Sequence, residues 1–234
     1  MLEDGYEKYF APRHPFKRRV WTQERLEFQG KGLPIGGWAR LYERLNKVEE
    51  EDTHTDVWIE RKIYDDPDKD GEDEWSVKET RCLRYLREIP IPKTKVSRLA
   101  GPGTLLFGPI FQKPLLTHRF TPTNTLLTQF SNLTNNFHRI HIDPEYARSV
   151  EQYPDILVHG SLSITILLRA FTDYQESKGE NLRITKAKYV MYRPLYVDKP
   201  ITLTITATKS SNKRAVLWDD QNRKAVECIL SLRP

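Results

Sequence analysis

The feature that most constrains the fold is an apolar segment of eighteen residues, positions 161–178, enclosed between Gly160 and Gly179. Apolar side chains recur almost all round the helix that it would form, and its first charged residue is Arg169. Its β-branched residues also permit a strand, but its length favours a helix with Ser161 as the N-cap. A helix that is apolar on all sides must be buried. Because strand patterns surround it, we expect an α+β fold in which a curled antiparallel sheet wraps one long buried helix.

Strand patterns lie on both sides of that segment. Runs rich in β-branched and aromatic residues, several of them alternating with polar residues, predict strands around Val57–Ile63 and Trp75–Leu83, and at Leu126–Phe130, Ile184–Val197, Ile201–Thr208, Ala215–Asp219 and Ala225–Leu232. The stretch 38–48 fits neither period, so helix and strand both stay open there. Residues 1–37 carry Pro and Gly without a clear period, and we expect turns.

Two loop-like stretches organise the chain. The acidic stretch 65–74 resembles a calcium loop in composition only, because its residues do not match the ligand positions of such a loop. A hairpin loop is the simpler interpretation. Residues 89–117 are dense in Pro and Gly and indicate a connector. We therefore expect two units, residues 1–117 and residues 118–234.

Charge and cysteine content exclude several classes of protein. The 37 basic and 32 acidic residues leave a net charge of +5, which suits an anionic ligand but lacks the concentrated basic stripe of a nucleic-acid binder. Cys82 and Cys228 lie far apart and indicate neither a disulfide framework nor a zinc site, so we expect a reducing setting. Neither a secretory signal nor a membrane-spanning run is evident. We expect a soluble cytoplasmic protein, or a mitochondrial one if a transit peptide was removed.

The residues best suited to chemistry gather just before the apolar segment. The stretch FSNLTNNFHRIHIDPEYA contains Asn136, His138 and His141, and YPDILVHG ends in His159 and Gly160. Two imidazoles three residues apart face the same way in a turn, and imidazole titrates near neutral pH. Gly160 begins the expected helix, where backbone N–H groups can hold an oxyanion and glycine lets a ligand approach closely. A base beside an oxyanion donor predicts proton removal next to a carbonyl, or water addition to a conjugated double bond.

Plainer roles compete for the same residues. A pair of histidines beside strands is often structural. A metal site made of His138, His141 and Asp143 would lack further ligands, so no metal is expected. His159 is expected to border the substrate in a structural role, bonded to the backbone at the helix entry. Arg193 would either pair with a phosphate of coenzyme A, as a substrate-binding residue, or be an ordinary strand-end arginine.

The ordered motifs FSNLTNNFHRIHIDPEYA and YPDILVHGSL resemble the signature of the MaoC-like hot dog family of (R)-specific hydratases and dehydratases. The resemblance is strongest to its fungal 3-hydroxyacyl-thioester dehydratase and mesaconyl-CoA hydratase-like branch. In the family pattern G-D-x-N-P-L-H the final histidine falls on His141, and the glycine of a later V-H-G falls on Gly160. At the position of the family's catalytic aspartate this chain has Asn136, and at the position of the family's asparagine it has His138. The branch whose motif reads N-x-H-x-I-H shares both changes. The first half resembles the fungal branch more weakly, through RHPFKRRVW and EWSVKETR.

The resemblance implies a double hot dog, with residues 1–117 as a degenerate N-terminal repeat and connector, and residues 118–234 as the repeat that carries the active site. It implies a hydro-lyase that interconverts 2-enoyl and 3-hydroxyacyl thioesters in fatty acid or polyketide metabolism. His141 would be the base, Asn136 and His138 would assist it, and Gly160 would donate to the oxyanion.

No cofactor is implied beyond the coenzyme A or phosphopantetheine of the substrate itself. An acyl-CoA or an acyl carrier protein would be the partner, neither nucleic acid nor membrane would be, and a homodimer would fit. Two alternatives stay open: a hot dog enzyme repurposed for isomerisation or cyclisation in natural-product biosynthesis, and a non-catalytic acyl-binding subunit.

Overall fold

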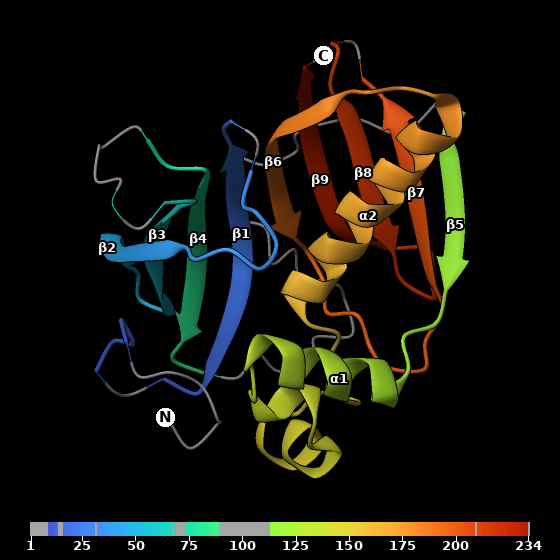
Figure 1. The fold of residues 1–234 in the computed structure, drawn as a ribbon. Coiled ribbons are helices and arrows are strands. Elements are labelled where there is room, and N and C mark those ends of the chain that lie inside the picture. Colours follow the sequence, from blue (N-terminus) through green and yellow to red (C-terminus); the bar gives the residue numbers. More distant parts are fainter. Residues whose placement is uncertain are drawn as a thin grey trace.

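The computed structural model describes residues 9–13, 16–30, 32–66, 68, 74–88, 113–208 and 210–233. They form one nine-stranded antiparallel sheet with the strand order β2-β3-β4-β1-β6-β9-β8-β7-β5 (Figure 1). The strands are β1 (Arg18–Phe28), β2 (Arg40–Glu50), β3 (His54–Tyr64), β4 (Val77–Leu86), β5 (Leu116–Phe120), β6 (Arg183–Met191), β7 (Ile201–Ala207), β8 (Lys213–Trp218) and β9 (Lys224–Arg233). The two α-helices are α1 (Asn124–Thr134) and α2 (Gly160–Lys178), with short helical turns at Arg139–His141 and Tyr146–Val150 between them.

Helix α2 is the predicted long helix, and the curved sheet wraps around it from β6 to β7 (Figure 1). Leu167 and Phe171 on its inner face are fully buried among core residues of β7, β8 and β9. One face of the helix is nevertheless exposed, and Arg169 and Asp173 form an ion pair of 2.7 Å there. The helix is therefore buried along one broad face and not on all sides. It begins at Gly160, so Ser161 lies inside the helix and is not its N-cap.

The first half of the chain contributes β1 to β4 to one end of the sheet. The sequence leaves helix and strand open for the stretch 38–48. Most of this stretch belongs to strand β2, which pairs with β3. Turns are expected from the sequence before residue 37, but this region contains strand β1. Charged residues are interspersed along the strand, so no clear apolar alternation marks it. The predicted hairpin between β3 and β4 is confirmed by their antiparallel pairing, although most of the loop itself lies outside the described residues.

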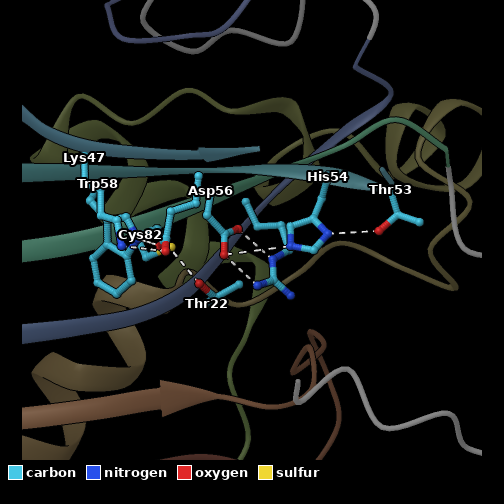
Figure 2. A network of polar contacts seen from close by, with 9 residues as sticks. Thr22, Lys47, Thr53, His54, Asp56, Trp58 and Cys82 are labelled. Carbon is cyan, nitrogen blue, oxygen red and sulfur yellow. Dashed lines mark hydrogen bonds and ion pairs between the residues drawn. The ribbon is translucent and has the colours of Figure 1, made fainter. Parts of the chain in front are cut away.

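A network of polar contacts links neighbouring strands in this half (Figure 2). Asp56 of β3 accepts two hydrogen bonds, of 2.7 and 2.6 Å, from the guanidinium of Arg84, its partner across the β3–β4 ladder. Trp58 donates its indole N–H to Glu49 of β2 at 2.7 Å. Such paired polar side chains explain why the alternation of apolar residues along these strands is weak.

In the second half, three sequence expectations need correction. Residues 126–130 belong to α1 and not to a strand, because Thr123 caps that helix by accepting a hydrogen bond from the Leu126 N–H at 3.2 Å. Strand β6 ends at Met191, before Val197, since Pro194 interrupts the ladder. Strand β5 lies partly inside the predicted connector. Residues 89–112 of that connector are outside the described part of the chain.

The two halves of the chain are joined through one strand pair. β1 lies antiparallel to β6, with Glu24 opposite Tyr189 and Leu26 opposite Ala187, so the sheet is continuous from β2 to β5. The described part of residues 1–117 contains no helix, and α2 is the long helix of the second half. The division into repeats at 117 and 118 stays a prediction. No helix in the described residues has the length and apolar character needed to cross a membrane.

Replacing Leu167 tests how far burial of α2 stabilises the fold. Leu167→Ala removes a side chain with no exposed surface, and we expect a loss of about 2–5 kcal/mol in the free energy of unfolding. Arg169→Ala on the exposed face of the same helix is the matched control, with an expected loss below about 1 kcal/mol. Denaturant titration followed by circular dichroism measures both values, and equal losses would contradict the burial of this face.

Candidate active site

The loop that carries the histidines is set by the end of α1. Asn135 adopts a left-handed conformation (φ 52°) and ends the helix, and the N–H of Asn136 donates to the Ser131 carbonyl at 3.0 Å. The chain then makes a tight turn in which the His141 N–H donates to the His138 carbonyl at 3.0 Å. This turn faces the two imidazoles toward the interior, where both are buried.

Three predicted histidines meet in one buried cluster. The rings of His141 and His159 are stacked, with centroids 3.9 Å apart and planes inclined by 20°. The His138 ring meets the His141 ring edge-on, at 5.7 Å and 90°. Their exposed fractions are 5% for His138, 7% for His141 and 0% for His159. His159 comes from the start of α2, so the cluster joins the two motifs that the sequence separates.

The hydrogen bond of His141 defines its tautomer. Its Nδ1 lies 2.9 Å from the Leu157 carbonyl oxygen, which can only accept, so Nδ1 carries the proton and Nε2 is the basic nitrogen. Burial lowers the pKa of His141 to about 4, although the bond to Leu157 favours the protonated ring and raises it. His141 is therefore a neutral imidazole at neutral pH.

His159 differs from the expectation of a bond to the backbone. Its Nε2 lies 2.8 Å from the hydroxyl oxygen of Ser131 on α1, and no side-chain hydrogen bond caps α2. Its Nδ1 is buried and has no hydrogen-bond partner. Burial, with a smaller contribution from His141, lowers the pKa of His159 to about 2. The pKa of His138 is also lowered well below its usual value, chiefly by burial. All three rings are neutral at neutral pH.

The first turn of α2 has uncapped backbone N–H groups, and its glycine packs against neighbouring strands. The N–H groups of a helix's first turn have no partners within the helix, and here no side chain caps them. A Cβ placed on Gly160 would lie 2.5 Å from the Met191 Cε and 3.2 Å from a ring carbon of Trp21. A side chain at position 160 would therefore displace the flexible end of Met191 and press on Trp21, so α2 packs closely against β6 and β1 on that side, which is closed to a ligand.

Strand β1 brings two residues to the site that the sequence analysis missed. The positive charge of buried Arg19 contributes to the lowered pKa values of His138 and His141. Trp21 contacts the start of α2 and packs against both apolar clusters of the protein. The stretch RHPFKRRVW contains both residues and carries part of the weaker resemblance to the family, so it could have indicated them.

The other residues singled out by the sequence are Asn136, Arg193 and Asp143. Asn136 is half-buried, and its Oδ1 accepts a hydrogen bond from the His138 N–H at 3.3 Å. Arg193 is half-buried after β6, and the structure gives no contact between it and the histidines. Asp143 is paired with Arg139 at 2.7 Å. Among the described residues no group of three His, Cys, Asp or Glu side chains is placed to hold a metal ion.

Comparison with known proteins finds relatives and structural neighbours that are named as dehydratases or hydratases. The chain is 26% identical to the mitochondrial hydroxyacyl-thioester dehydratase type 2 of Schizosaccharomyces pombe, over 93% of this chain and 74% of that protein. It is 27% identical to mesaconyl-C(4)-CoA hydratase of Chloroflexus aurantiacus, over 68% of this chain and 52% of the relative. A MaoC-like dehydratase from Phytophthora capsici shares the fold with a TM-score of 0.68, at 13% identity, over 96% of this chain and 72% of that one.

These likenesses confirm the double hot dog fold and the resemblance on which it was predicted. The model of the family "hydroxyacyl-thioester dehydratase type 2" matches residues 1–197, which is most of the chain. The chain therefore belongs to the hydroxyacyl-thioester dehydratase type 2 family, a family of hydro-lyases, as the histidine and helix-start motifs predict.

Proposed function

We propose that this protein interconverts 2-enoyl and 3-hydroxyacyl thioesters by adding or removing water. The observation that carries the proposal is the position of His141. Its basic Nε2 belongs to a buried neutral ring that stacks on the residue directly before the uncapped start of α2. We therefore assign the base and the oxyanion donors to neighbouring positions in the site. Membership of the dehydratase family and the names of the relatives support the same reaction class.

In the hydration direction, His141 takes a proton from water through Nε2 as the water oxygen bonds to C3 of the enoyl group. The C2–C3 double-bond electrons move toward the thioester carbonyl, and the oxyanion of the resulting enolate accepts hydrogen bonds from the Gly160 N–H and the first turn of α2. The proton on His141 then passes to C2, which completes the addition of one water molecule. Dehydration follows the same steps in reverse.

The lowered pKa of His141 suits the second half of this cycle. A buried imidazole is a weak base, but once protonated it is a strong acid, which favours return of the proton to C2. Asn136 cannot act as a base, because an amide does not accept the proton at neutral pH. We assign its Nδ2 group to hold the reacting water, since its Oδ1 is engaged by the His138 N–H. His138 closes the edge of the His141 ring.

The thioester handle, the compartment and the assembly are also part of the proposal. Coenzyme A or the phosphopantetheine of a carrier protein would hold the acyl group, with Arg193 as a partner for a phosphate. The printed names of both yeast relatives contain the word mitochondrial, which favours that compartment over the cytoplasm. A homodimer remains the proposed assembly.

One observation favours a second function. Asn136 stands where the family's general pattern has a catalytic aspartate, so the carboxylate of the usual pair of aspartate and histidine is missing. Isomerisation or cyclisation of an acyl thioester needs only one group that moves a proton, and His141 supplies it. Incubation with crotonyl-CoA separates the two functions, because hydration consumes the conjugated absorbance and an isomerase of other thioesters leaves it unchanged.

Removal of the base tests the proposed reaction. His141→Ala should lower kcat for crotonyl-CoA hydration by about 10²–10⁴-fold, because the loss of a positioned general base removes that part of the rate enhancement. The matched control is His54→Ala, which removes an imidazole from the polar network of β3, where it contacts Thr53 at 2.9 Å (Figure 2). Unchanged hydration by folded His141→Ala protein would contradict the assignment.

The pH dependence of kcat/KM, which reflects the free enzyme, reports the protonation state of His141. Since His141 must be neutral to act and burial lowers its pKa to about 4, kcat/KM should stay level on acidification and fall only as the pH approaches that value. The folded state is also destabilised on the way, because the unfolded chain binds protons near the usual pKa of 6.5 while the folded chain resists them until about pH 4.

Circular dichroism at each pH separates the two effects by measuring the folded fraction. An acidic limb near the ordinary histidine pKa, seen in fully folded protein, would contradict a buried neutral His141.

A further inference from the structure

The His159 ring is fixed on three sides by side chains of the second half of the chain. Ser131 lies 2.8 Å from its Nε2, the Phe130 ring meets it edge-on at 5.0 Å and 64°, and the His141 ring covers one face. Ser131 is 1% exposed and His159 is fully buried, so no water competes for this hydrogen bond. The ring therefore has one orientation, set mainly by two consecutive residues of α1.

The His141 ring depends on that neighbour for its own orientation. Its only hydrogen bond within the described structure runs from Nδ1 to the Leu157 carbonyl, at 2.9 Å. A single bond at one ring nitrogen fixes the tautomer but leaves the ring free to tilt about that bond. The His159 face, 3.9 Å away and nearly parallel, removes this freedom on one side, and the edge-on His138 ring limits it on another.

We propose that His159 is a positioning residue, locked by Ser131, whose stacked ring holds the plane of His141 so that Nε2 points at the reacting ligand. The inference deepens the proposed function and rests on it for the role of His141. It also assigns a task to Ser131, which lies near the start of the stretch FSNLTNNFHRIHIDPEYA and has no part in the proton transfer.

The stack also suits the charge that forms during the reaction. When Nε2 of His141 gains a proton, the imidazolium lies over the π face of a neutral ring, which is a favourable arrangement for a cation. His159 stays neutral throughout, because its own pKa is lowered further than that of His141. The other groups that face the pair are the His138 ring and the charge of Arg19, which opposes a second positive charge.

Two substitutions of His159 distinguish the effect of its stacked ring from the effect of its hydrogen bond to Ser131. His159→Phe keeps a stacked ring and loses the bond to Ser131, whereas His159→Gln keeps an amide that reaches Ser131 and loses the ring. We expect kcat to fall about 100-fold in His159→Gln, as for a misplaced catalytic group, and no more than about 10-fold in His159→Phe. KM should stay within about threefold in both, because ground-state binding is not altered. Ser131→Ala, which removes one hydroxyl, should lower kcat about fivefold.

Equal kcat losses in His159→Phe and His159→Gln, or losses confined to KM, would overturn the positioning role. If His159→Gln does not fold, Ser131→Ala decides, and a kcat equal to the wild-type value would then overturn it. Arg169→Ala, on the exposed face of α2, is the control for an unspecific effect on the helix.

A second readout does not depend on activity. In protein with ¹³C-labelled histidine, NMR relaxation of the ring C–H groups of His141 should give the order parameters of a rigid ring in the wild type and lower ones in His159→Gln, while the Nδ1–H tautomer, which the Leu157 carbonyl fixes, stays the same in both. Wild-type protein that shows a rigid His141 ring but hydrates no thioester would overturn the proposed function and leave the positioning of His141 standing. Identical ring order parameters in wild type and His159→Gln would overturn the inference alone.

Discussion

The contact between the first turn of α2 and strands β1 and β6 fixes the geometry of the whole site. Gly160 permits it without displacement, because a larger residue would push the flexible end of the Met191 side chain aside and press on Trp21. Once the first turn is held there, its N–H groups have a defined direction, and His159 is carried into the interior beside His141. The two halves of the sheet meet beside this contact, through the ladder between β1 of the first half and β6 of the second. Fold and site thus share one packing requirement.

The electrostatic character of the site follows from burial. Three imidazoles lie together in the interior, and a positive charge from Arg19 acts on two of them. In such surroundings the neutral ring is favoured, so the His141 ring is unprotonated at neutral pH and, once protonated, releases its proton readily. The dyad of aspartate and histidine in the family's general pattern works with a negative charge next to the base. With the neutral Asn136 in that place, the proposed mechanism assigns to the helix N-terminus the task of balancing the charge of the reacting oxygen.

Much of this fold could be predicted from the sequence. Length and apolar content identify α2, alternation identifies most strands of the second half, and the ordered motifs single out His138, His141, His159 and Gly160. The failures share a physical cause, which is that tertiary partners decide them. Residues 126–130 suit either a strand or a helix, and the cap supplied by Thr123 favours the helix.

The contacts around the histidines could not be predicted for a related reason. Arg19 reaches them only because β1, which has no clear period, is placed beside β6. Ser131 is separated from His159 by 28 residues, and no local pattern indicates that the two side chains meet. The motifs singled out the histidines that meet in the buried cluster, but spacing along the chain could not show which neighbours orient them.

The central claim is that His141 and the first turn of α2 act on the same ligand. The most direct measurement is a crystal structure of His141→Gln protein with a bound 3-hydroxyacyl-CoA. The account predicts the 3-hydroxyl group within about 3.2 Å of the side chain at position 141, and the thioester oxygen within the same distance of the Gly160 nitrogen. A thioester bound elsewhere, or one whose carbonyl points away from α2, would contradict it.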